Sequence, residues 1–223
     1  MEFPRQTCAL LHMAIKLLNL EKLKLETMGA LEDIVPGKLY DANYDPEILN
    51  LRKEAKIKLY EYNDSSPCEE EKREQFLRKF LGSCGKNPVI EPPFYCDYGN
   101  NIHIGNNFYS NHNFVVLDGA KVHIGDNVFI APNVGLHTAG HPIDAERRIQ
   151  GLEYAIPITI GDNVWIGAGV SVIAGVSIGK GSVIAAGSVV IRDIPESVVA
   201  AGNPCKVIRK ITKSDGETTD FRK

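Results

Sequence analysis

Histidine is the side chain whose charge changes near neutral pH, so the six histidines of this chain are its first candidates for proton transfer. His141 stands in Gly140-His-Pro, within a stretch (138–157) that interrupts an otherwise regular repeat. His103 and His123 each immediately precede an isoleucine of that repeat, so we expect both to face solvent. We therefore single out His141 as a candidate general base, a group that takes a proton from an attacking hydroxyl.

Metal chemistry would need several ligands that converge on one point. His103 and His123 are about one turn of the repeat apart and could stack on one face, but the sequence offers no third ligand beside them. The five cysteines are odd in number and lack CxxC spacing, so we predict neither a zinc site nor a disulfide framework. Reduced cysteines are typical of the cytoplasm, which is the location that we predict.

The repeat that surrounds these residues places an aliphatic or small residue at every sixth position, most clearly at Ile160, Ile166, Ile178 and Ile184. A period of six fits neither an amphipathic helix nor an alternating strand. It fits a coil with short flat faces, each made of one strand and one corner. Three hexads make one triangular turn, so we predict a mainly-β fold, a parallel β-helix of about four coils. A glycine-rich β-sandwich is the alternative, and it would need turns every eight to twelve residues.

Bulk composition excludes several functional classes. The chain has 223 residues with 25 basic and 28 acidic side chains, and no basic stripe stands out, so we predict no nucleic-acid partner. No apolar run approaches the length of a membrane span, and we do not interpret the N-terminal segment as a signal peptide. We predict no membrane association.

The chain divides into four parts by its sequence pattern. We predict a leader (1–27) that is either an artefact of the gene start or an extra helix, a helical cap (28–86), a β-helix domain (87–211) with an extruded loop (138–157), and a flexible tail (212–223). Asp45-Pro-Glu predicts the start of a first cap helix, because Asp caps helix N-termini and Pro suits the first turn. We expect its apolar side to include Leu49, Ile57, Leu59 and Tyr60, and a second helix to run from Glu69 to Leu81.

Several segments together resemble one family. They are Gly37-Lys-Leu-Tyr-Asp and Leu59-Tyr-Glu-Tyr-Asn in the cap, Gly140-His-Pro in the loop, Pro157-Ile-Thr-Ile-Gly-Asp-Asn-Val-Trp-Ile-Gly, and the ending Ala200-Ala-Gly-Asn-Pro-Cys-Lys-Val-Ile-Arg. The chain, from about Gly29 to Ile211, is similar to the sugar O-acetyltransferases, the maltose, galactoside and nodulation-type members of the hexapeptide-repeat acyltransferases. The resemblance implies a left-handed parallel β-helix with a small helical cap. It also implies acetyl-CoA as donor, a sugar hydroxyl as acceptor, no required metal, and a homotrimer with active sites between subunits.

The resemblance also implies roles on the acceptor side. His141 would be the general base, Asn111 would bind the acceptor, and Asp118 would bind sugar hydroxyls. The further candidates for the same cleft are Asp41, Tyr109 and Glu153. For Asn111 and Asp118 the alternative is a corner residue that caps the backbone.

Three residues depart from the family's usual pattern near this cleft. Ser110 and His112 replace two residues of a Tyr-Ala-Asn-Phe-like run, and Gly119 stands where a second Asp often falls. These departures leave the identity of the acceptor open, but not the type of reaction.

On the donor side, the narrow prism of the coil has no room for tryptophan, so we expect Trp165 to lie outside, along the arm of CoA. The resemblance implies that Ala168 offers a backbone N–H near the thioester carbonyl. It further implies that Ala186 and Gly187 flank the pantetheine groove. Three cations are candidates for the nucleotide phosphates, namely Arg192, Lys206 and Arg209.

Two other functions stay open. One is an antibiotic or other small-molecule O-acetyltransferase on the same coil, against which the two-helix cap argues. The other is a non-catalytic or metal-binding β-helix protein, which would need a third ligand beside His103 and His123. A thiol-release assay with acetyl-CoA and a panel of sugars separates all three.

Overall fold

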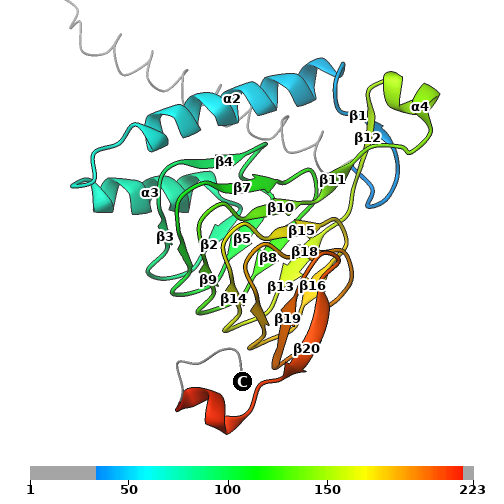
Figure 1. Ribbon diagram of the computed structural model, residues 1–223. Coiled ribbons are helices and arrows are strands. Elements are labelled where there is room, and N and C mark those ends of the chain that lie inside the picture. The colour runs from blue at the N-terminus through cyan, green and yellow to red at the C-terminus, as the bar shows by residue number, and fades with distance from the viewer. Residues whose placement is uncertain (1–33, 218–223) are drawn as a thin grey trace, which may run out of the picture.

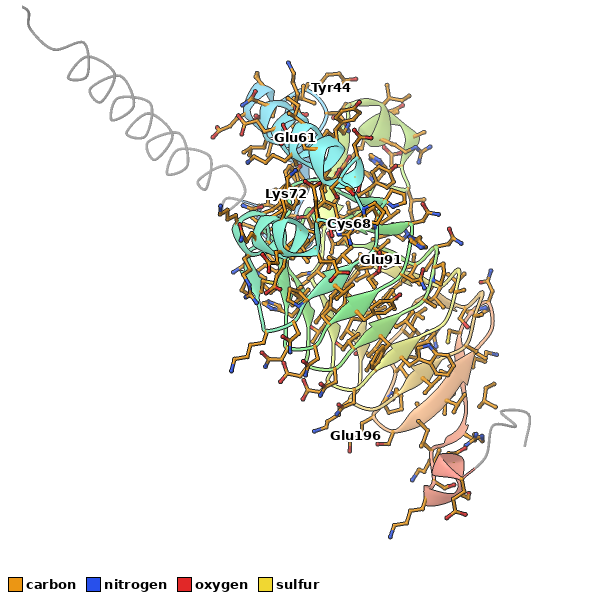
Figure 2. All side chains as sticks on the ribbon, turned by 90° about the vertical axis from the view of Figure 1, so that its left-hand side faces the viewer. Tyr44, Glu61, Cys68, Lys72, Glu91 and Glu196 are labelled. Carbon is orange, nitrogen blue, oxygen red and sulfur yellow. The ribbon has the colours of Figure 1, made fainter. Side chains whose placement is uncertain are left out.

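The computed structural model describes residues 34–217, so the predicted leader (1–27) lies outside the described residues. Within that range a triangular coil of short strands stacks from the cap helices at one end to the C-terminal segment at the other (Figure 1). Figure 2 shows the same arrangement from the side, with Tyr44 and Glu61 on the cap and Glu196 at the far end of the coil. No helix among the described residues is long and apolar enough to cross a bilayer.

Three parallel sheets form the faces of the coil, and their strands follow one another in turn along the chain. The first face contains β2 (Ser83–Cys84), β5 (Ile102–Ile104), β8 (Val122–Ile124), β13 (Ile158–Ile160) and β16 (Ser177–Ile178). The second contains β4 (Phe94–Cys96), β7 (Phe114–Leu117), β10 (Gly135–His137), β15 (Ser171–Ile173) and β18 (Val189–Val190). The third contains β3 (Val89–Ile90), β6 (Tyr109–Ser110), β9 (Phe129–Ile130), β14 (Trp165–Ile166), β17 (Val183–Ile184) and β19 (Val198–Ala201), to which β20 (Lys206–Lys210) adds antiparallel. The predicted parallel β-helix is confirmed.

The hexad positions point inward and stack in register. Ile104, Ile124, Ile160 and Ile178 are neighbours on successive strands of the first face, and all are buried. Only apolar or small side chains fit inside the prism, and an inward position recurs every six residues. The six-residue period of the sequence follows from this packing. The coil begins at β2, before the predicted boundary at residue 87. The sequence pattern missed this turn because cysteine occupies two of its inward positions, Cys84 and Cys96, where it packs as a small apolar residue.

The cap helices α2 (Pro46–Asn63) and α3 (Glu70–Phe80) form where the sequence predicted them. Asp45 caps α2 by accepting the N–H groups of Glu47 at 2.8 Å and Ile48 at 3.1 Å. The predicted apolar side was largely wrong, because Leu49, Ile57 and Tyr60 are exposed. The helix instead buries Ile48, Ala55, Leu59 and Tyr62.

Polar contacts fix α2 on the first turns of the coil. The hydroxyl of Tyr62 donates to the Ile90 carbonyl at 2.6 Å, and the amide of Asn63 bonds both backbone groups of Phe94, at 2.8 and 2.9 Å. The cap is therefore held against β3 and β4 by hydrogen bonds as well as by apolar packing.

The interruption at 138–157 is an ordered hairpin. It consists of β11 (Ala139–Gly140), the short helix α4 (Ala145–Ile149) and β12 (Leu152–Ala155), and it projects beside the cap (Figure 1). The cap strand β1 (Tyr40–Asp41) pairs antiparallel with β12, so one small sheet joins two segments more than 100 residues apart in sequence. At the other end, the short helix η1 (Lys213–Gly216) follows β20.

Candidate active site

His141 directly follows β11, and its ring has one nitrogen committed to the backbone. Nδ1 lies 3.0 Å from the carbonyl oxygen of Leu152. A carbonyl can only accept, so Nδ1 carries the hydrogen and the lone pair of the neutral ring lies on Nε2. The side chain is 48% exposed, so Nε2 can be reached from solvent. This arrangement is the one that a general base requires.

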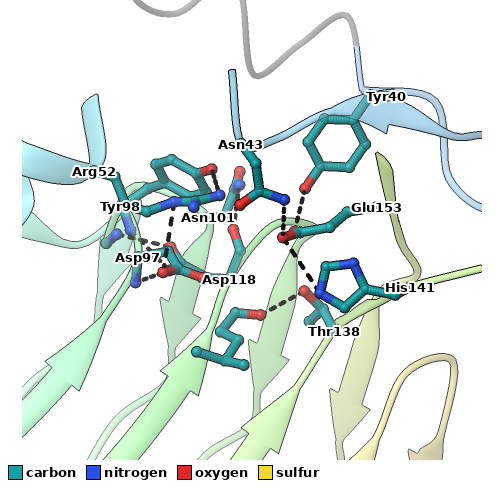
Figure 3. A network of polar contacts seen from close by, with 12 residues as sticks. Tyr40, Asn43, Arg52, Asp97, Tyr98, Asn101, Asp118, Thr138, His141 and Glu153 are labelled. Atoms are coloured by element: carbon teal, nitrogen blue, oxygen red, sulfur yellow. Dashed lines mark hydrogen bonds and ion pairs between the residues drawn. The ribbon is translucent and has the colours of Figure 1, made fainter. Parts of the chain in front are cut away.

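The hairpin brings the carboxylate of Glu153 to the free side of this ring. Its Oε1 lies 3.8 Å from Nε2 of His141, and its side chain is only 12% exposed (Figure 3). β12 therefore supplies both the carbonyl that orients the imidazole and the acid that faces it. Gly140 leaves room for the ring of Tyr154 on β12, because a Cβ there would lie 2.5 Å from it.

Two cap residues that the sequence reasoning missed complete the cluster. The hydroxyl of Tyr40 donates to Oε2 of Glu153 at 3.5 Å, and the amide of Asn43 donates to Oε1 at 3.4 Å and to the Gly151 carbonyl at 2.8 Å. Burial raises the pKa of Tyr40, so its phenol stays protonated and can donate. No local pattern reveals these residues, because their position depends on the pairing of β1 with β12.

Asp41 lies on the same cap strand but closes a turn. Its Oδ1 accepts the N–H groups of Asn43 at 3.2 Å and Tyr44 at 2.8 Å. The side chain is exposed, and its register partner is Leu152, next to Glu153. Asp41 thus stabilises the segment that carries Asn43.

The prediction that Asp118 binds sugar hydroxyls is wrong. Asp118 is fully buried, and its carboxylate accepts the backbone N–H groups of Asp97 and Tyr98, both at 2.9 Å, and of Gly99 at 2.7 Å. Its oxygens are thus used to close a corner of the coil, and no acceptor can reach them. Burial raises the pKa of Asp118 to about 6.

Arg52 and Asp97 form a second polar group beside the first (Figure 3). The guanidinium of Arg52 donates to the hydroxyl of Tyr98 at 3.2 Å and lies over its ring, and its Nε is 3.8 Å from Oδ1 of Asp97. Burial raises the pKa of Asp97. A signal existed in the sequence, because Arg52 lies four residues after Ile48 and three before Ala55, on the buried face of α2.

Asn111 and Tyr109 lie elsewhere on the chain. Tyr109 is on β6 of the third face, where its ring packs 6.3 Å from that of Phe129, and Asn111 follows the same strand. The side-chain oxygen of Asn111 accepts the N–H of His112 at 2.7 Å. Among residues 34–217, no hydrogen bond or ion pair joins His141 to either residue. One chain therefore brings together His141 and Glu153, with Asp41 on the adjacent strand, but not Asn111 or Tyr109.

Predicted donor residues cluster farther along the coil. Trp165 is 43% exposed and lies in register with Phe129 and Val183 on the outside of the third face, as its size required. Ala168 and Gly187 are exposed and joined, since the Gly187 N–H donates to the Ala168 carbonyl at 2.8 Å. Ala186, Arg192 and Lys206 are exposed as well.

Arg209 is not the free cation that we predicted. Its guanidinium donates to both carboxylate oxygens of Asp215, at 2.9 and 2.6 Å. This two-point ion pair ties η1 to β20 and neutralises the charge that a phosphate would need.

His103 and His123 stack outside the first face, with ring centroids 4.8 Å apart, and Ser83 Oγ lies 3.0 Å from Nδ1 of His103. Burial and the neighbouring His123 lower the pKa of His103. Across the described part of the chain, no three His, Cys, Asp or Glu side chains are grouped so that they could hold a metal ion.

Comparison with known proteins gives consistent matches along this architecture. Residues 35–85 match the maltose acetyltransferase hexapeptide capping motif, and residues 157–192 match the bacterial transferase hexapeptide (six repeats). A Saccharomyces cerevisiae relative whose name places it among the acetyltransferases is 75% identical over 196 residues, which span 88% of this chain and all of that protein. Galactoside O-acetyltransferase of Escherichia coli is 50% identical over 188 residues, covering 84% of this chain and 92% of that protein. The structure of a galactoside acetyltransferase in complex with coenzyme A superposes with a TM-score of 0.79 at 48% identity, covering 83% of this chain and 92% of that one.

Proposed function

The chain belongs to the maltose and galactoside O-acetyltransferases of the hexapeptide-repeat family, and from this premise we propose that it transfers the acetyl group of acetyl-CoA to a hydroxyl of a sugar. The observation that carries the proposal is the state of His141. Its Nδ1 is held by the Leu152 carbonyl, so Nε2 is left open to accept a proton. His141 stands on the hairpin whose strand β12 pairs with the cap strand β1.

In the proposed reaction His141 moves one proton twice. Nε2 takes the proton of the sugar hydroxyl while its oxygen forms a bond to the thioester carbon. The carbon–sulfur bond then breaks, and the leaving sulfur takes the proton from Nε2. The products are the sugar acetate and CoA with a free thiol. The backbone contact at Nδ1 keeps the ring oriented through both steps.

The acceptor pocket in this proposal is lined by Glu153, with Arg52 and Asp97 at its far side. These groups suit a ligand with several hydroxyl groups, because carboxylates accept from hydroxyls and a guanidinium donates to them. Asp41 supports the wall of this pocket through its turn and is not a direct ligand. A polyhydroxylated acceptor suits these groups. The second candidate, an antibiotic or another small molecule as acceptor, is favoured by no specific observation.

We further propose that the active site is shared between copies in a homotrimer. Tyr109, Asn111 and Trp165 lie on or beside the third face, away from the His141 hairpin of their own chain. That face exposes an apolar row in which Val89 is 42%, Phe129 54% and Trp165 43% exposed. Exposed apolar rows of this kind mark interaction sites. A neighbouring copy would bring its His141 to this row and so complete the site.

On the donor side, the arm of acetyl-CoA would follow the outside of the coil past Trp165, Ala168, Ala186 and Gly187. Arg192 and Lys206 remain as the cations for its phosphates. The described cysteines are unpaired, which is consistent with the reducing cytoplasm as the site of action.

The direct test is release of the CoA thiol from acetyl-CoA in the presence of a panel of maltose, glucose and galactoside acceptors, followed by mass spectrometry of the sugar. We expect acceptor-dependent thiol release with a gain of one acetyl group on the sugar. Thiol release that no sugar accelerates would reject the proposal.

A further inference from the structure

Two hydrogen-bond acceptors face each other in the candidate site. When His141 is neutral, Nε2 carries a lone pair, and Oε1 of Glu153 lies 3.8 Å away. Two acceptors at this separation repel unless donors lie between or beside them. One donor is the hydroxyl that loses its proton to Nε2. The carboxylate of Glu153 accepts two long hydrogen bonds, from Asn43 at 3.4 Å and Tyr40 at 3.5 Å, so its remaining lone pairs can accept a further donor.

The carboxylate is held in this position from the cap and not from its own hairpin. The hydrogen bonds to its two oxygens come from the amide of Asn43 at 3.4 Å and the hydroxyl of Tyr40 at 3.5 Å. The amide of Asn43 also donates a hydrogen bond to the Gly151 carbonyl of the hairpin at 2.8 Å. Asn43 and Tyr40, which are 110 and 113 positions from Glu153 in sequence, thus hold its carboxylate in place, and we call this pair the clamp.

Gly119 provides the space in which Tyr40 reaches Glu153. A Cβ at this position would lie 3.0 Å from the Tyr40 hydroxyl and 3.2 Å from the Cβ of Ala155. The backbone of Gly119 does not have a positive φ, so an alanine there would not strain the backbone and would act by crowding Tyr40 and Ala155.

We propose that Tyr40 and Asn43 are positioning residues that hold the carboxylate of Glu153 to receive a second hydroxyl of the acceptor, while the first donates to His141. The inference rests on the proposed sugar acetyltransferase activity and narrows its substrate class. The acceptor must present two hydroxyl groups close together, and docking of the cap onto the hairpin becomes a condition for recognising it. The chemistry at Nε2 itself does not involve either cap residue.

The test compares the variants Y40F, N43A, G119A and E153Q with the control N50A. Asn50 makes the same kind of contact, an amide to the carboxylate of Glu54 at 3.1 Å, on the exposed side of α2. For Y40F and G119A we expect the KM for the sugar to rise by about threefold, and for N43A and E153Q by about tenfold or more. The KM for acetyl-CoA should stay within about twofold in every variant, and N50A should match the wild type.

A set of monodeoxy acceptors identifies the second hydroxyl directly. In the wild type one deoxy sugar should lose about tenfold or more in kcat/KM, and this loss should shrink to about twofold in E153Q and in N43A. A merely structural role for the clamp predicts an equal penalty for every acceptor and would overturn the inference. So would a deoxy penalty in N43A that is as large as in the wild type.

Crystal structures of N43A and Y40F separate this inference from the proposed function. We expect the carboxylate of Glu153 to leave its place opposite Nε2 in N43A and to shift less in Y40F, whether or not a sugar is acetylated. A wild-type enzyme that acetylates no sugar would reject the proposed function. A Glu153 that keeps its 3.8 Å separation from His141 in N43A would reject the clamp.

Discussion

The carboxylate of Asp118 accepts the backbone N–H of Gly99 at 2.7 Å, deep inside the first turns of the coil. With the N–H groups of Asp97 and Tyr98 on its other oxygen, it ties three consecutive backbone donors to one side chain. We therefore expect Asp118→Ala to lower the free energy of unfolding by about 2–4 kcal/mol, because buried donors would lose their partner. Urea unfolding measures this.

The matched control for that variant is Asp126→Ala. Asp126 also caps a corner, through the N–H of Asn106 at 2.7 Å, but water can replace it there. We expect a clearly smaller loss for this variant than for Asp118→Ala. Equal losses in the two variants would contradict the assignment of Asp118 as the critical buried cap.

Asp118 also predicts a dependence of stability on pH. Burial raises the pKa of its folded carboxyl to about 6, whereas an unfolded Asp titrates near about 3.9. The folded state binds this proton more tightly, so the contribution to stability is full below about pH 4 and is lost as the pH rises through about 6. We expect the unfolding free energy of the wild type, relative to Asp118→Asn, to fall by about 3 kcal/mol across this window. A difference that does not vary between pH 4 and 7 would refute it.

His141→Ala should lower turnover by roughly two to four orders of magnitude while leaving the fold and the binding of acetyl-CoA intact, because it removes only the base. His123→Ala is the control, since that ring stacks on His103 outside the coil and away from the site. Turnover and circular dichroism of both variants check this. Activity of His141→Ala within a few fold of the wild type would remove His141 from the role.

Donor binding should respond to Lys206 and Arg192 and not to Arg209. Lys206→Ala and Arg192→Ala should raise the KM for acetyl-CoA several-fold and make it less sensitive to salt, since phosphate contacts are ionic and screened. Arg209→Ala should leave this constant within about twofold, because Asp215 already occupies the guanidinium. Steady-state kinetics at two ionic strengths decide it. An Arg209→Ala variant as impaired as Lys206→Ala would show that the ion pair opens for the donor.

Sites shared between copies predict complementation. We expect His141→Ala and Asn111→Ala to be nearly inactive as separate proteins. When they are denatured and refolded together, some interfaces should receive His141 from one copy and Asn111 from the other, and activity should return. Analytical ultracentrifugation should show trimers in each case. No recovery in mixed trimers would place both residues of a site on the same chain.

Three features could be predicted from the sequence. They are the coil, from its six-residue period, the start of α2 at Asp45, and the location of His141 in the stretch that interrupts the repeat. Each depends on a local rule, namely which side chains fit inside the prism, which residues cap a helix, and where a repeat is broken. Two local predictions were wrong. The start of the coil was placed too late, because cysteines occupy inward positions of its first turn, and the buried side of α2 was largely misassigned.

Only the tertiary structure decided which side chains surround His141. The pairing of β1 with β12 carries Tyr40 and Asn43 to Glu153, and no pattern within either segment specifies that partner. The same holds for Asp118 and Arg209, whose residue types suit ligand binding but whose charges are already taken up by Gly99 and its neighbours and by Asp215. A period records what a residue packs against inside its own repeat. Contacts between distant segments depend on the tertiary fold of the whole chain, and no local sequence pattern specifies them.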